Sequence, residues 1–232
     1  MDINFGKFEQ NVGIVFKEKN LLKQAFTHRS FINENKNIKL AHNERLEFLG
    51  DAVLELVVTD FLYKTYPQKP EGELTTYRSA LVNSITLSEV ASNLFMNDYL
   101  LLSKGEAKDT GRARQYILAN TFEAVAGAIY LDQGYDVAES FIAKHILIFA
   151  DKMIERGNLV DAKSLFQEKA QEKTNSTPSY KLIRESGPDH NKSFTVGVFI
   201  NKEQIAIGDG KSKQEAEQSA AVRALEIKGW SA

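Results

Sequence analysis

The chain has 232 residues and a mass of 26.1 kDa, which allows one large domain or two modest ones. Its composition, with 43% hydrophobic and 26% charged residues and no cysteine, excludes a disordered chain, disulfides, thiolate metal sites and cysteine nucleophiles. The formal net charge of −2 argues against a protein coated in positive charge, so a nucleic-acid partner would need a local basic surface.

The N-terminal segment has no basic stretch followed by an apolar run, and nowhere do about 18 consecutive apolar residues occur. We therefore expect a cytoplasmic protein that does not enter a membrane.

Residues 20–151 carry apolar side chains at helical spacing, and this pattern predicts an all-helical region. Pro67 and Pro70 are predicted to end one long helix and to mark a turn. The polar stretch at 155–160 is predicted to be a linker. The first domain should thus be all-α and span residues 1–154.

Residues 161–230 are predicted to form a second domain. A helix from Asp161 to about Lys173 is expected first. The segment SFTVGVFI then alternates at period two, between the strand-like segments SYKLIRE and EQIAIGD, and predicts three antiparallel strands. Ser212 and Glu215 form a capping box that opens a final helix. The second domain is therefore predicted to be a small α+β domain with the order α-β-β-β-α.

Carboxylates recur at spacings of three and four residues in the first domain. Glu44, Glu47 and Asp51 follow each other in this way, so they lie on one face of a predicted helix. Asn120 and Glu123 are the polar members of a second, otherwise apolar helix. If the two helices lie side by side, these oxygen ligands surround one point, and such a set suits Mg²⁺ or Mn²⁺.

The polar residues could instead form a solvated surface or another kind of active site. The acidic row extends to Glu55, and charged rows on helices are often only solvated surface. The four histidines lack the spacing of a zinc site, and no phosphate-binding glycine loop or serine nucleophile turn is present. From spacing alone, both the metal site and the solvated acidic face stay open.

The segment HNERLEFLGDAVL at residues 42–54 resembles the signature of bacterial ribonuclease III, and the resemblance covers nearly the whole chain. The last 70 or so residues resemble a double-stranded RNA-binding domain that ends in GDGKSKQEAEQSAAVRAL. The other family motifs follow in order as PEGELTTYRSALVN, LSKGEAKDTGR and ILANTFEAVAGAIYLDQG, at residues 70–83, 102–112 and 117–134.

The resemblance implies roles for particular acids. Glu47, Asp51 and Glu123 match the catalytic and metal-binding carboxylates of the family. Glu44 and Glu71 match accessory catalytic acids that contact waters of the metal site, substrate or the dimer partner. These assignments imply hydrolysis of double-stranded RNA with Mg²⁺, for which Mn²⁺ could substitute, and no small-molecule substrate.

The family cuts phosphodiester bonds with a metal-activated water and leaves 5′-phosphate and 3′-hydroxyl ends. It acts as a homodimer in RNA processing, such as the maturation of ribosomal RNA precursors and messenger RNA. Phe48 matches the aromatic residue that inserts into the partner subunit, although an ordinary core Phe is the alternative.

The metal site departs from the family at one position. Asn120 stands where the family usually has Asp, so it keeps a carbonyl acceptor without the charge and would act as a weaker member of the metal site. The alternative function is therefore a protein that binds double-stranded RNA but has a weakened catalytic metal site. A third hypothesis, an all-helical assembly factor, requires KSKQEAE to be incidental.

The resemblance also implies which residues hold RNA. The first helix of the second domain would contact 2′-hydroxyls, the GPDHN loop would reach a minor groove, and lysines at the last helix would meet phosphates. Net charge does not indicate RNA here, because residues 161–232 carry only +1. The implied RNA-binding residues are Ser164, Gln167, Glu168, Pro188, His190, Lys211 and Lys213.

Overall fold

The computed structural model describes residues 3–150, 162–188 and 192–230 of the chain. The chain divides into two compact units, Met1–Leu159 and Val160–Ala232. The predicted linker at 155–160 and the predicted helix start at Asp161 lie outside the described residues. No described helix has the length and apolar character needed to cross a lipid bilayer.

In the described part of the first unit, the regular elements are helices, as the spacing of its apolar residues predicted, with one isolated bridge between Thr27 and Leu101. An additional helix that the sequence analysis did not identify begins at Phe5. The helices are α1 (Phe5–Val12), α2 (Lys19–Ala25), α3 (Arg29–Glu34), α4 (Glu44–Thr65), α5 (Glu71–Val82), α6 (Ser84–Asn93), α7 (Arg112–Gln133) and α8 (Tyr135–His145), with short 3₁₀ turns η1 (Met96–Tyr99), η2 (Glu106–Lys108) and η3 (Leu147–Phe149).

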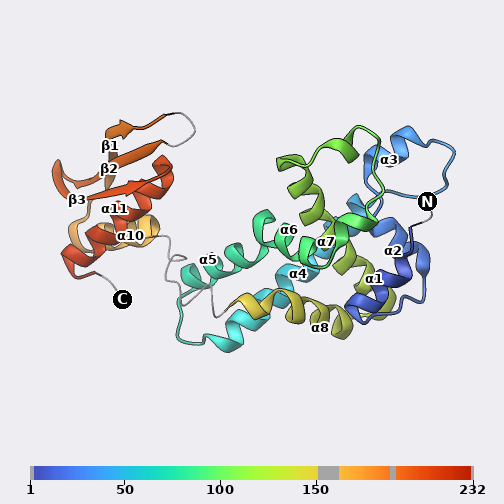
Figure 1. Cartoon of the computed structure of the whole chain (residues 1–232). Coiled ribbons are helices and arrows are strands. Elements are labelled where there is room, and N and C mark those ends of the chain that lie inside the picture. Colours follow the sequence, from blue (N-terminus) through green and yellow to red (C-terminus); the bar gives the residue numbers. More distant parts are fainter. Residues whose placement is uncertain (1–2, 151–161, 189–191, 231–232) are drawn as a thin grey trace. The chain divides into compact units, whose positions relative to one another are not determined.

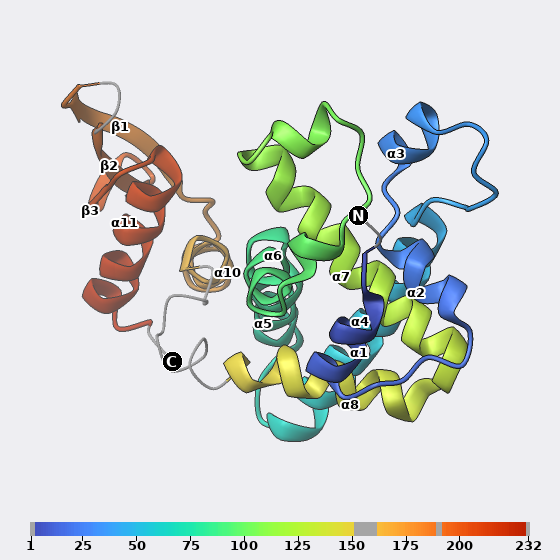
Figure 2. The ribbon, with the colours of Figure 1, turned by 45° about the vertical axis from the view of Figure 1, so that its right-hand side comes forward.

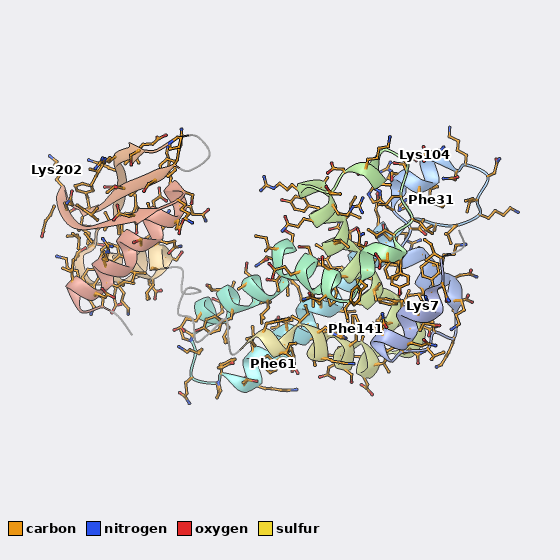
Figure 3. The ribbon with its side chains drawn as sticks, in the orientation of Figure 1. Lys7, Phe31, Phe61, Lys104, Phe141 and Lys202 are labelled. Carbon is orange, nitrogen blue, oxygen red and sulfur yellow. The ribbon has the colours of Figure 1, made fainter. Side chains whose placement is uncertain are left out.

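Helices α4 and α7 form the centre of this unit, and the other helices pack around them (Figure 1, Figure 2). Apolar side chains from most of the helices build one core. Phe122 of α7 and Phe141 of α8 stack within it, with ring centroids 5.4 Å apart. Figure 3 labels Phe141. Pro70 is the N-cap of α5, so the prediction that Pro67 and Pro70 separate two helices is confirmed.

Polar side chains tie the N-terminal segment to this core. The Glu9 carboxylate accepts hydrogen bonds from the Phe16 N–H and from Lys19 Nζ. The Asp132 carboxylate, at the end of α7, accepts from the backbone N–H groups of Lys17 and Glu18 at 2.8 and 2.7 Å. These contacts hold the loop after α1 against the C-terminal end of α7.

The second unit contains α10 (Ala162–Thr174), β1 (Ser179–Ser186), β2 (Ser193–Ile200), β3 (Glu203–Gly210) and α11 (Lys213–Lys228). The strands form an antiparallel sheet in the order β1-β2-β3, so the predicted α-β-β-β-α arrangement is confirmed. Asn201 and Lys202, both at positive φ, make the tight turn between β2 and β3, and Figure 3 shows Lys202 at this turn.

One face of this sheet packs on α10 and α11, as Figure 2 shows. Val198 and Ile200 point to these helices at period two, and Phe166 of α10 is fully buried beneath them. The alanines of α11 allow it to lie close to the sheet.

Candidate active site and RNA-binding surfaces

Two glycines let α4 and α7 cross in backbone contact. A Cβ at Gly50 would lie 1.7 Å from the carbonyl oxygen of Glu123, and a Cβ at Gly127 would lie 2.3 Å from the carbonyl oxygen of Leu46. Any side chain at either position would force the helices apart. Both glycines are therefore packing positions, and the close crossing brings the polar faces of α4 and α7 together.

Three predicted carboxylates meet at this crossing. Burial, followed by the negative charges of Asp51 and Glu47, raises the pKa of Glu123 to about 8. Burial also raises the pKa of Glu47, to which Glu44 and Asp51 add their charges. The side chains therefore lie close enough to repel one another, and the local charge favours a cation.

Asn120 belongs to the same group of side chains. Its side-chain amide donates a hydrogen bond to the Glu47 carboxylate, and this bond opposes the rise of the Glu47 pKa. An ionised aspartate could not donate in this way. Asn120 thus holds Glu47 without adding charge to the site.

Glu44 lies at the edge of the site, near an arginine and a histidine. Its carboxylate lies 3.6 Å from Arg29 Nη1 and 3.7 Å from His42 Nδ1. Arg29 begins α3, so the corner between α2 and α3 reaches the start of α4. Neither Arg29 nor His42 could be predicted as part of the site, because nothing in their spacing along the sequence indicates this contact.

Glu71 lies apart from the crossing. It begins α5 and accepts a hydrogen bond from Thr75 Oγ1 at 2.9 Å. It lines a hollow together with Thr59 and Tyr63 of α4, and Thr59 lies eight residues, or about 12 Å, along the helix from Asp51. The structure therefore does not bring Glu71 together with the other predicted acids of the same chain.

The oxygen donors at the crossing fit a hard divalent cation. Within the described parts of the chain, no three Asp, Glu or His side chains converge closely enough to bind one ion directly. Mg²⁺ keeps several of its waters and needs only one or two protein carboxylates, so the group formed by Glu47, Asp51 and Glu123 still suits it. Burial and the neighbouring carboxylates raise the pKa of Glu123, and a bound cation would instead favour its ionised form.

Phe48 lies on the outside of α4 with 81% of its surface exposed. The alternative that Phe48 is an ordinary core residue is therefore wrong. Further exposed residues follow it along the same side of the helix at spacings of three or four, and they are Ala52, Leu56, Thr59 and Tyr63.

The predicted RNA-binding residues of the second unit are exposed. Ser164, Gln167 and Glu168 lie along a hollow on the outer face of α10. Pro188 is exposed after β1, whereas His190 lies outside the described residues.

Lys211 and Lys213 are exposed at the start of α11. The predicted capping contact of Ser212 is present, because the Glu215 N–H donates to Ser212 Oγ at 3.1 Å. The Glu215 carboxylate, however, accepts from the Lys211 N–H at 2.7 Å, one residue before the N-cap. A carboxylate therefore lies between the backbone of Lys211 and the first turn of α11.

Comparisons with known proteins agree with this geometry. Residues 18–149, more than half of the chain, match the family described as Ribonuclease-III-like, and residues 162–228 match the double-stranded RNA binding motif. A Ribonuclease 3 of Enterococcus faecalis is 46% identical over 222 residues, covering 94% of this chain and 95% of that protein. A Ribonuclease 3 of Borreliella burgdorferi is 47% identical and covers 94% and 89%.

A solved structure agrees as well. The nuclease domain of ribonuclease III from Campylobacter jejuni, described as flexible in a region involved in dimer formation, is 40% identical with a TM-score of 0.56. The match covers 62% of this chain and 99% of that domain. The fold and site define a helical nuclease joined to a double-stranded RNA-binding domain. The chain belongs to the ribonuclease III family of endoribonucleases.

Proposed function

We propose that this protein hydrolyses phosphodiester bonds of double-stranded RNA and leaves 5′-phosphate and 3′-hydroxyl ends. The observation that carries the proposal is the group of carboxylates at the α4–α7 crossing, in one chain with a double-stranded RNA binding motif. We further propose that it acts in the cytoplasm in RNA processing, such as the maturation of ribosomal RNA precursors or messenger RNA.

Glu47, Asp51 and Glu123 would hold Mg²⁺ or, as a substitute, Mn²⁺. When bound, the cation lowers the pKa of a water and stabilises negative charge on the leaving oxygen. The side chains of the protein would position the groups that take part in this chemistry. Glu123, protonated below about pH 8 before a cation binds, would release its proton as the site fills. Glu44, held by Arg29, would remain at the edge to orient waters or RNA.

The second unit would hold the duplex by shape. Exposed polar side chains of α10 would contact 2′-hydroxyls, Pro188 and His190 would reach a minor groove, and Lys211 and Lys213 would contact phosphates. Because few of these contacts depend on the base, the affinity should depend on salt more than on sequence.

We propose that the protein is a homodimer, joined through the exposed stripe on α4. Two antiparallel copies of α4 around an axis near Leu56 would bring Phe48 of each copy to the region of Tyr63 in the other. The hollow beside Tyr63 is also lined by Glu71. In this pairing Glu71 would therefore lie near the partner's acidic site.

Light scattering tests the dimer. Phe48→Glu should yield a monomer, whereas Ile227→Glu, which replaces an exposed apolar residue of α11, should leave the dimer intact. A wild-type monomer would contradict the proposed pairing.

The nuclease proposal is tested with a long, perfectly paired RNA duplex in Mg²⁺ and in EDTA. Cleavage should require the metal, whereas binding should persist in EDTA because the second unit needs no cation. Cleavage that is unchanged in EDTA would contradict the proposed role of the carboxylates.

Asn120→Asp distinguishes the nuclease from the alternative function, a protein that only binds RNA. The new carboxylate should lower the Mg²⁺ concentration for half-maximal cleavage by roughly tenfold, the range typical for side chains around a metal site. If the wild-type protein does not cleave and the variant does, the alternative is correct. The comparisons with known relatives do not favour that outcome.

A further inference from the structure

The first turn of α11, where Lys211 and Lys213 are proposed to contact RNA phosphates, also contains a carboxylate. Glu215 Oε2 accepts a hydrogen bond from the backbone N–H of Lys211 at 2.7 Å. The Glu215 N–H is itself bonded to Ser212 Oγ, so the residue is attached to this turn at both its backbone and its side chain. A phosphate oxygen at a helix N-terminus accepts hydrogen bonds from backbone N–H groups in the same way.

The charge of Glu215 is not balanced by another side chain. Glu217, two residues later, forms an ion pair with Lys163 of α10 at 2.5 Å. In contrast, no ion pair joins Glu215 to any Lys, Arg or His among the residues that the structure describes. Gln214, between Lys213 and Glu215, adds no charge. The turn thus carries two lysines and one uncompensated carboxylate.

We propose that Glu215 is an internal competitor of the RNA phosphate and that it limits the affinity of this domain for duplex RNA. The inference rests on the proposed function, because it requires that α11 meets phosphates. In the free protein the Glu215 carboxylate accepts the hydrogen bond that the Lys211 N–H donates. When RNA binds, a phosphate oxygen must displace the carboxylate or approach it against its negative charge.

The size of the effect follows from electrostatics. A carboxylate within one helical turn of a phosphate lies inside the Debye length of about 8–10 Å, so its repulsion is only partly screened. Glu215→Gln keeps the shape and an oxygen acceptor but removes the charge. We expect this variant to bind duplex RNA roughly threefold more tightly at low salt, with a smaller gain as salt rises.

Glu226→Gln is the matched control. Glu226 is exposed on the same helix, and its substitution changes the net charge by the same amount. It lies eleven residues, or about 16 Å, from Glu215 along the helix axis, beyond the Debye length. If only the net charge of the domain matters, both variants will gain affinity equally. If the competitor acts locally, only Glu215→Gln will gain.

The experiment measures binding of a short RNA duplex to the full chain in EDTA at two salt concentrations, with the melting temperature of each variant. Glu215→Asp keeps the charge, and we expect it to bind no more tightly than wild type. Tighter binding by Glu215→Gln alone supports the inference. Equal or weaker binding by Glu215→Gln overturns it, while wild-type protein that does not bind duplex RNA overturns the proposed function as well.

Discussion

The α4–α7 crossing and the first turn of α11 are both expected to meet RNA phosphates, yet they carry opposite charges. At the crossing, burial and then the charges of Asp51 and Glu47 raise the pKa of Glu123 to about 8. At α11, the side chains of Lys211 and Lys213 are exposed. We therefore propose that the first region needs a cation before phosphate can approach, whereas the second attracts phosphate directly.

The largest expected effect separates cutting from binding. Glu123→Gln should reduce cleavage of duplex RNA at least about a thousandfold, because metal-assisted charge stabilisation contributes several kcal/mol. RNA affinity measured in EDTA should not change. Glu55→Gln, at an exposed acid of the same row on α4, should cleave within roughly twofold of wild type. Full cleavage by Glu123→Gln would show that the crossing is not the catalytic site.

Gly50→Ala tests whether the close helix crossing creates the acidic site. Its Cβ would lie 1.7 Å from a backbone oxygen of α7, and the free energy of unfolding should fall by about 3 kcal/mol. Gly72→Ala, at an open position in the first turn of α5, should be neutral or slightly stabilising. Urea unfolding of both variants measures the difference. A Gly50→Ala protein as stable as wild type would mean that the helices can move apart without a loss in the free energy of unfolding.

The raised pKa of Glu123 predicts an unusual pH dependence of stability in the metal-free protein. The carboxyl binds its proton more tightly when folded, at a pKa of about 8, than when unfolded, at about 4.5. The stabilisation from this group is fully present below the pKa of the unfolded state. It is lost as the pH rises through the pKa of the folded state, by up to about 1.4 kcal/mol per pH unit. Unfolding in EDTA from pH 5 to 9 should show this decrease, which Glu123→Gln should abolish.

The smallest expected effect concerns the basic region. Lys213→Gln should weaken binding of duplex RNA roughly fivefold and reduce the salt dependence by about one phosphate contact. Lys202→Gln, at the turn between β2 and β3, removes the same charge away from α11 and should have little effect (Figure 3). Equal losses in both variants would indicate attraction by overall charge.

Much of the secondary structure could be predicted because it depends on local patterns. Apolar spacing indicated the helical region, Pro67 and Pro70 marked the turn after a long helix, and alternation over SFTVGVFI predicted β2. Helix α1 was not identified, since the eight residues of Phe5–Val12 offer a short pattern. The hydrogen bond from the Lys211 N–H to the Glu215 carboxylate was also not predicted. A capping motif does not specify which backbone N–H donates to the carboxylate.

The sequence by itself determined which chemistry is available. The lack of cysteine limits any metal to oxygen or imidazole ligands, and the spacing of Glu44, Glu47 and Asp51 places three acids on one face of a helix. The motif resemblance indicated the family, which the comparisons confirm.

Only the tertiary structure decided which acids act on one another. Glu47 and Glu123 are 76 positions apart and meet because Gly50 and Gly127 allow two helices to touch, while Glu71 begins another helix and lies apart. Spacing along one helix sets the direction of its side chains, but the distance between helices depends on the atoms packed between them. The raised pKa of Glu123 is therefore a property of the fold and not of the motif.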